Sequence, residues 1–203
     1  MRIVRHSPSV AERTVGTIVS KFILEDWNPS EATLRRWAYD EDLYLAEQDE
    51  DLVLHDQNYL PLLLELAGEP LCPKAKYILA CVDAYLGLIV LRGSQRDLAI
   101  VSKGAAIAGQ SPSAIVGTWG QLLERRLGYR KGIGATSRHQ ALAMGQDLLN
   151  GVRRQSDIFI VAENPDSWEV GLSCSPSGGF GERLSICKRT GKFVYSRLAS
   201  GGG

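Results

Sequence analysis

The spacing of apolar residues changes once along the chain, from a period near 3.6 in the first three quarters to a period of two at the end. Several helical segments open on helix-start signals. Ser9 and Ser30 are candidate N-cap residues, Pro61 is expected in a first turn, and Thr136 or Ser137 is a candidate N-cap of the last segment. We therefore predict helices over residues 9–24, from Ser30 through Leu34, Trp37, Ala38 and Leu45, and over residues 59–67, 74–91, 95–108, 113–127 and 137–150.

From residue 156 onward, apolar and polar residues alternate in short runs separated by turn residues, which predicts strands over residues 157–162, 168–174, 184–187 and 193–198. Short connections between these runs favour an antiparallel meander, and the helix before them would cover one face of the sheet. The predicted fold class is α+β: an N-terminal helical bundle of antiparallel helices, followed by a helix packed on a four-stranded antiparallel sheet.

The composition changes after Gly128, where a glycine-rich basic connector covers residues 129–135. This change places a boundary between two parts of the chain. We predict a helical domain over residues 1–130, a small α+β domain over residues 136–198, and a flexible tail over residues 199–203. No fixed sequence period supports a repeat architecture.

The second predicted domain carries a sequence pattern that resembles one found in a protein family. The pattern is Trp168-Glu169-Val170, a Gly178-Gly179 loop, Leu184-Ser185-Ile186 and a closing turn over residues 188–194. Residues 136–198 resemble small cystatin-like or nuclear-transport-factor-like immunity domains of bacterial toxin–immunity loci. Because such domains act by binding, the resemblance implies a toxin-neutralising protein with no catalytic residues.

Composition adds little until the charge is divided along the chain. The 203 residues are 44% hydrophobic and 23% charged with a formal net charge of zero, which excludes a uniformly basic nucleic-acid binder. Residues 1–56 nevertheless carry 12 acids against 6 bases, and residues 92–154 carry 10 bases against 3 acids. The neutral total therefore consists of an acidic segment and a basic segment.

The acidic segment contains eight carboxylates within the 17 residues from Asp40 to Asp56, with no lysine or arginine among them. Such density indicates a solvated face or a surface for a basic partner. Interleaved aromatic residues suit an interface with apolar anchors. The predicted partner-binding residues, for a basic and toxin-like protein, are Trp37, Asp40, Glu41, Asp42, Tyr44, Glu47, Asp49, Glu50 and Asp51.

The basic segment gives the alternative prediction, a regulator that binds nucleic acid or another anion. Its candidate residues are Arg125, Arg126, Arg130, Lys131, Arg153 and Arg154. Two other readings stay open for the same residues. Cations at a helix end complement the helix dipole, and the basic residues could pair with the acidic segment inside the fold.

Signals for catalysis, metal or cofactor binding are weak, so we predict a protein that is not an enzyme and holds no cofactor. His6, His55 and His139 are far apart, and neither HExxH nor GxSxG occurs. The acidic run lacks the ligand spacing of a calcium loop. No secretory signal opens the chain, the four cysteines form no zinc pattern, and the most apolar stretch contains Asp83. We expect a cytoplasmic location and no membrane contact.

Overall fold

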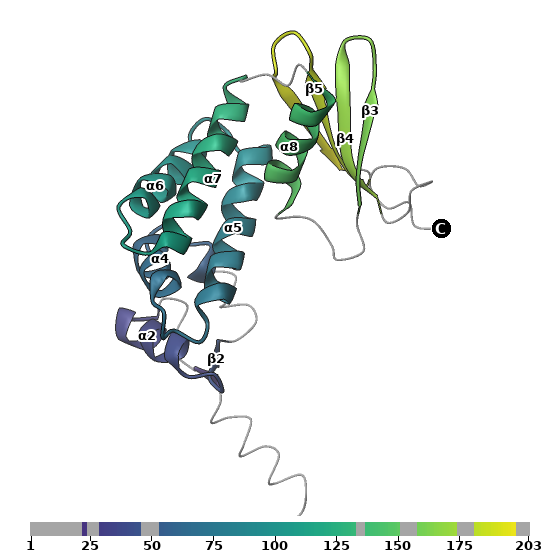
Figure 1. Ribbon diagram of the computed structural model, residues 1–203. Coiled ribbons are helices and arrows are strands. Elements are labelled where there is room, and N and C mark those ends of the chain that lie inside the picture. Colours follow the sequence, from purple (N-terminus) through teal and green to yellow (C-terminus); the bar gives the residue numbers. More distant parts are fainter. Residues whose placement is uncertain are drawn as a thin grey trace, which may run out of the picture.

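The computed structural model describes residues 22–23, 29–45, 53–132, 137–150, 158–173 and 181–197. A group of helices is followed by one helix on a four-stranded antiparallel sheet, so the predicted α+β class is confirmed (Figure 1). The elements are β1 (Phe22–Ile23), α2 (Glu31–Tyr39), β2 (Tyr44–Leu45), α4 (Leu60–Gly68), α5 (Ala75–Arg92), α6 (Leu98–Gly109), α7 (Ala114–Arg130), α8 (Arg138–Leu149), β3 (Ile158–Glu163), β4 (Ser167–Ser173), β5 (Glu182–Cys187) and β6 (Phe193–Arg197).

Helix α2 begins where the sequence predicted and ends earlier. The Ser30 hydroxyl accepts a hydrogen bond from the Thr33 backbone N–H at 3.2 Å, as an N-cap does. At Asp40 the backbone becomes extended, and the Asp40 carboxylate accepts the Asp42 backbone N–H at 3.0 Å. Aspartate commonly stabilises a turn in this way. The helix therefore ends before Leu45.

Two short strands replace predicted helix in the N-terminal part. Phe22 pairs with Tyr44, and Ile23 pairs with Leu45, in a parallel arrangement. The prediction of helix was therefore wrong at residues 22–23, near the end of the predicted 9–24 helix, and at Leu45. Aromatic and β-branched side chains favour extended backbone, and the turn at Asp40 directs the chain into the pairing. The rest of residues 9–24 lies outside the described residues.

Helices α4, α5, α6 and α7 form the bundle that the sequence predicted, with short connections that reverse the chain (Figure 1). Ile78, Val82 and Leu86, at helical spacing along α5, are fully buried. Two glycines allow close approach in the bundle: Gly120 of α7 lies against α6, and Gly104 of α6 lies against α5. A Cβ on Gly120 would lie 2.7 Å from the Cβ of Ala108, and one on Gly104 would lie 2.9 Å from a Leu86 methyl carbon.

Helix α8 packs on one face of the meander, whose strand order is β3-β4-β5-β6. The helix opens on a capping box in which Ser137 and Gln140 bond each other's backbone N–H. Gly145 of α8 lies directly against β4, because a Cβ there would lie 2.2 Å from a Val170 methyl carbon. Alternate residues of β4 – Trp168, Val170 and Leu172 – are buried, as the period-two pattern predicted.

Buried residues of the bundle, α8 and the sheet belong to one continuous cluster, from Leu34 to Phe193. Two side chains of the bundle reach β6. The Arg92 guanidinium stacks on the Tyr195 ring at 4.8 Å, and that of Arg130 stacks on the Phe193 ring at 5.7 Å. The division at residues 130 and 136 stays a prediction, and the predicted tail, residues 199–203, lies outside the described residues.

Candidate functional site

An exposed acidic turn, formed by Asp40, Glu41 and Asp42, follows α2. The Lys74 ammonium fixes the backbone of this turn. It donates hydrogen bonds to the carbonyl oxygens of Trp37 at 2.6 Å, of Leu43 at 2.8 Å and of Asp40. These carbonyls surround the C-terminus of α2, where backbone acceptors lack helical partners. Lys74 therefore fixes the path of the acidic turn.

The other predicted partner-binding residues do not all lie on this surface. Trp37 is only 1% exposed, and the Lys74 ammonium stands 5.2 Å from its ring centroid. Trp37 was therefore wrongly predicted to contact a partner, because its place on the inner face of α2 makes it a core residue. Tyr44 lies in β2, and its side chain is outside the described part. Glu47, Asp49, Glu50 and Asp51 lie outside the described residues.

Exposed apolar side chains lie beside the acidic turn. Tyr39, at the end of α2, is 44% exposed, and Leu71, in the loop between α4 and α5, is 86% exposed. The Cys72 thiol lies 3.5 Å from the carbonyl oxygen of Ala38, which brings this loop to the end of α2. Apolar and acidic side chains thus share one end of the bundle, as expected of an interface with anchors and a charged surround.

A groove of about 750 Å³ adjoins this end of the bundle. We call it the end groove. It lies between the loop that follows α4 and the loop that precedes α7. Its apolar lining includes Cys72, Leu79 and Ile115, and the Ile115 side chain is largely exposed. Its charged lining residues are Glu69 and Lys76.

Nearby carboxylates outside the turn are compensated by arginine. The Arg35 guanidinium contacts Glu31 and Glu65 at 2.9 Å, and Glu69 at 3.8 Å. The hydrogen bonds that Arg35 donates to the Glu31 and Glu65 carboxylates raise the pKa of Arg35. Within the described part of the chain, the carboxylates of Asp40 and Glu41 take part in no ion pair. Among the described residues, the carboxylates of Asp40 and Glu41 thus differ from those of Glu31, Glu65 and Glu69, which all contact Arg35.

The basic candidates of the sequence separate in the structure, and two of them face acids of the bundle. Arg126 is 1% exposed, with its guanidinium 2.5 Å from Asp83 of α5. It was wrongly predicted to bind an anion from solution, because Asp83 already neutralises it inside the core. Arg125 bonds the Asp147 carboxylate of α8 at 3.2 Å. Arg153 and Arg154 lie outside the described residues.

Asp147 and Asp83 organise a polar network where α5, α7 and α8 meet. The Trp119 indole N–H donates to Asp83 at 2.9 Å, and the Tyr129 hydroxyl donates to Asp147 at 2.9 Å. Burial, followed by the bond to Asp147, raises the pKa of Tyr129 to about 12. The Arg126 Nε–H donates to the Asp147 carbonyl oxygen. Sequence reasoning missed this network, although a lone acid in an apolar helix, Asp83, was a signal for it.

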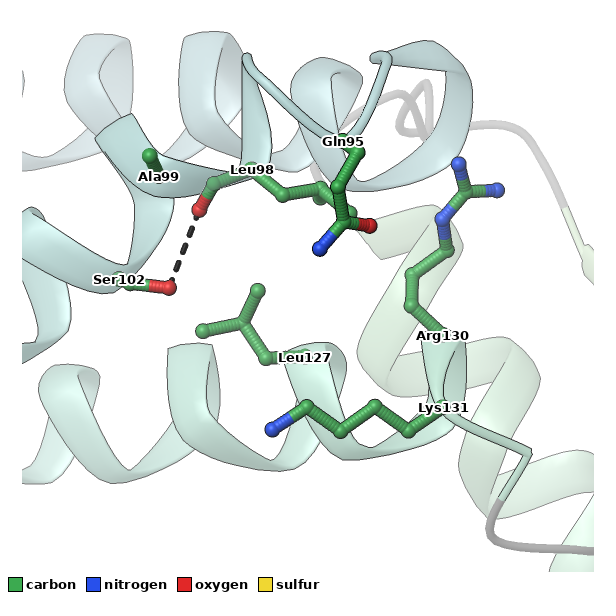
Figure 2. Close-up of a pocket in the computed structure, with 7 residues that line it drawn as sticks. All are labelled: Gln95, Leu98, Ala99, Ser102, Leu127, Arg130 and Lys131. Atoms are coloured by element: carbon green, nitrogen blue, oxygen red, sulfur yellow. Dashed lines mark hydrogen bonds between the residues drawn. The ribbon is translucent and has the colours of Figure 1, made fainter.

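Arg130 and Lys131 remain at the surface and border a second cavity, which we call the α6–α7 cavity (Figure 2). The Arg130 guanidinium donates to the Gly93 carbonyl oxygen at 2.9 Å. Among the described residues, none of the partners of Arg125, Arg126 and Arg130 comes from the acidic segment. The possibility that the two charged segments neutralise each other therefore receives no support from these three arginines.

Other candidate chemistry is sparse. His55 stacks on the Tyr85 ring at 4.6 Å, and His139 is exposed at the start of α8. Within the described ranges, no group of three or more His, Cys, Asp or Glu side chains could hold a metal ion.

A search of the described helices for a membrane span found none long and apolar enough to cross a bilayer.

Comparisons with protein-family models, with curated proteins and with solved structures gave no match.

Proposed function

We propose that this chain is a non-enzymatic protein-binding module of the immunity type, which neutralises a basic protein by occluding its active site. The supporting observation is the acidic turn held by Lys74 through three carbonyl oxygens. A surface that is fixed before binding loses little conformational entropy when the complex forms. Its exposed carboxylates would steer a basic partner toward the turn.

The neighbouring apolar side chains supply the second part of the proposed interface. Tyr39 and Leu71 flank the acidic turn, and removing their exposed apolar surface from water favours association. Interfaces derive most of their binding energy from a few such anchors inside a polar rim. The end groove continues this surface and offers a recess for a side chain of the partner. A cytoplasmic location belongs to the same proposal.

The experiment compares two charge-reversed variants with equal change in net charge. Glu41→Lys with Asp42→Lys alters the acidic turn but keeps Asp40, whose carboxylate bonds the backbone. Glu124→Lys with Asp166→Lys alters two exposed acids in α7 and in the β3–β4 turn. Each protein is tagged and incubated with extract of the organism that encodes it, and mass spectrometry identifies what is retained.

We expect the native chain and the Glu124/Asp166 variant to retain the same basic protein. The Glu41/Asp42 variant should retain it at least about tenfold less, because charge contacts of this kind contribute a few kcal/mol. Circular dichroism and thermal unfolding establish that both variants are folded. The proposal is wrong if the native chain retains no basic protein, or if the two variants retain it equally.

A further inference from the structure

The α6–α7 cavity has a volume of about 460 Å³, within the range of small-molecule sites. Figure 2 shows Leu127 pointing into it from α7, and Gln95 and Ser102 facing it from the α6 side. Lys131 runs along α7 below Leu127, and the Arg130 guanidinium points in the opposite direction. Leu98 and Ala99 complete the apolar part of the lining. The cavity therefore combines an apolar floor with a polar edge.

The charge of the edge is positive. Arg130 and Lys131 are its only charged residues among those described, and no carboxylate lines the cavity. Asp97, which directly precedes Leu98 in the sequence, is not a lining residue, and one of its carboxylate oxygens accepts hydrogen bonds from the backbone N–H and hydroxyl of Ser94. The first turn of α6 borders the cavity through Leu98 and Ala99, and a helix N-terminus carries partial positive charge.

Arg130 is fixed before any ligand binds. It donates one hydrogen bond to the Gly93 carbonyl oxygen, and its guanidinium stacks on the Phe193 ring. A guanidinium carries five N–H donors, so this bond leaves donors for a further acceptor. Lys131 is exposed, and its ammonium takes part in no hydrogen bond or ion pair with the described residues. The two cations thus differ: Arg130 is held by two contacts, whereas the Lys131 ammonium keeps its hydrogen-bond donors available to a ligand.

We propose that the α6–α7 cavity binds a small amphipathic carboxylate, with its alkyl chain on Leu98, Ala99 and Leu127 and its carboxylate at Lys131. A carboxylate accepts charge-assisted hydrogen bonds, which are stronger than those between neutral groups. An alcohol of the same length would keep the apolar contacts and lose the charge. The positively charged head group of an amine would be repelled by the positive edge of the cavity. The cavity therefore selects for the carboxylate head.

The test uses octanoate, octanol and octylamine as probes of the native chain, followed by amide chemical shifts in nuclear magnetic resonance. We expect saturable shifts with octanoate on both walls of the cavity, with weaker shifts for octanol and none for octylamine. Octanol that binds as tightly as octanoate would overturn the selection for a carboxylate. Octanoate that gives no saturable shift at millimolar concentration would overturn the site itself.

Matched variants separate the site from general charge effects. Lys131→Gln should weaken octanoate binding about tenfold, the value of one charge-assisted hydrogen bond. Lys103→Gln removes the same charge from an exposed position of α6 outside the lining, and it should leave the affinity unchanged. Ala99→Trp keeps both cations and fills the cavity, so it should abolish binding. Equal losses in the Lys131 and Lys103 variants would overturn the assignment.

Discussion

Replacing Asp83 with alanine leaves the Arg126 guanidinium buried without its counter-charge. The guanidinium is 1% exposed and the Asp83 side chain is 17% exposed, so water can replace little of the lost interaction. Removing one member of a buried pair typically costs about 3–5 kcal/mol. The Trp119 indole N–H loses its acceptor in the same variant. For a domain whose total stability is about 5–15 kcal/mol, the loss is large.

The decisive variant removes both charges. With Asp83→Ala and Arg126→Met together, no charge remains buried, and the apolar methionine occupies part of the space of the arginine. We expect the double variant to be about 1–2 kcal/mol more stable than Asp83→Ala alone, because apolar replacement of a buried pair is often neutral or favourable. The Asp147 carbonyl oxygen loses its Arg126 donor, which limits the recovery.

Urea unfolding followed by circular dichroism measures these free energies, and an unchanged dependence on urea shows that the same transition is compared. Glu163→Ala is the control. It breaks the exposed Lys188–Glu163 pair and should cost less than about 1 kcal/mol. The reasoning is refuted if Asp83→Ala costs no more than the control, or if the double variant is less stable than Asp83→Ala.

Three further predictions concern packing, the acidic turn and pH. Gly145→Ala should lower stability to urea by about 1–3 kcal/mol because its Cβ would overlap Val170, whereas Gly117→Ala, with open space around it, should be neutral or stabilising. Lys74→Met should cost about 2 kcal/mol in the same assay, through three lost carbonyl contacts, and should weaken partner retention. Because the folded pKa of Tyr129 lies near 12, above its usual value of about 10, the unfolded chain loses this proton first, and stability should fall as pH rises from 10 to 12. Tyr129→Phe should show a smaller fall, and an equal fall would contradict the assignment.

Periodicity alone predicted most helices and all strands of the meander, because each buries one face against the common core. The ends of the helices were harder to predict from the sequence. The sequence predicted a helix from Gln95, but α6 begins at Leu98. The Asp97 carboxylate accepts the Ser94 backbone N–H and hydroxyl, which holds residues 94–97 as a turn. Side chains that form hydrogen bonds with nearby backbone groups favour turns over helix. The spacing of apolar residues does not reveal this effect.

The pairing of β1 with β2 could not be predicted from the sequence, because it depends on contact between segments about 20 residues apart. The same limit applies to Arg126. Its sequence neighbours Arg125 and Arg130 suggested a surface cluster, whereas its partner Asp83 lies 43 residues earlier. The helical repeat places Arg126 on the same buried face of α7 as Trp119 and Leu123. A buried guanidinium is strongly destabilising unless a carboxylate pairs with it, and Asp83 on the facing helix supplies that carboxylate.

The two proposed sites are anchored near opposite ends of α5, a helix that Figure 1 shows along its length, and we therefore expect them to act independently. Lys74, just before α5, holds the acidic turn, and Gly93, just after it, anchors Arg130. The 18 residues of α5 span about 27 Å, roughly three times the Debye length in physiological salt. Glu41→Lys with Asp42→Lys should therefore leave the octanoate affinity unchanged, and Lys131→Gln should leave partner retention unchanged. A change in either cross-measurement would mean that the charges act through the whole molecule, and would contradict the assignment of separate sites.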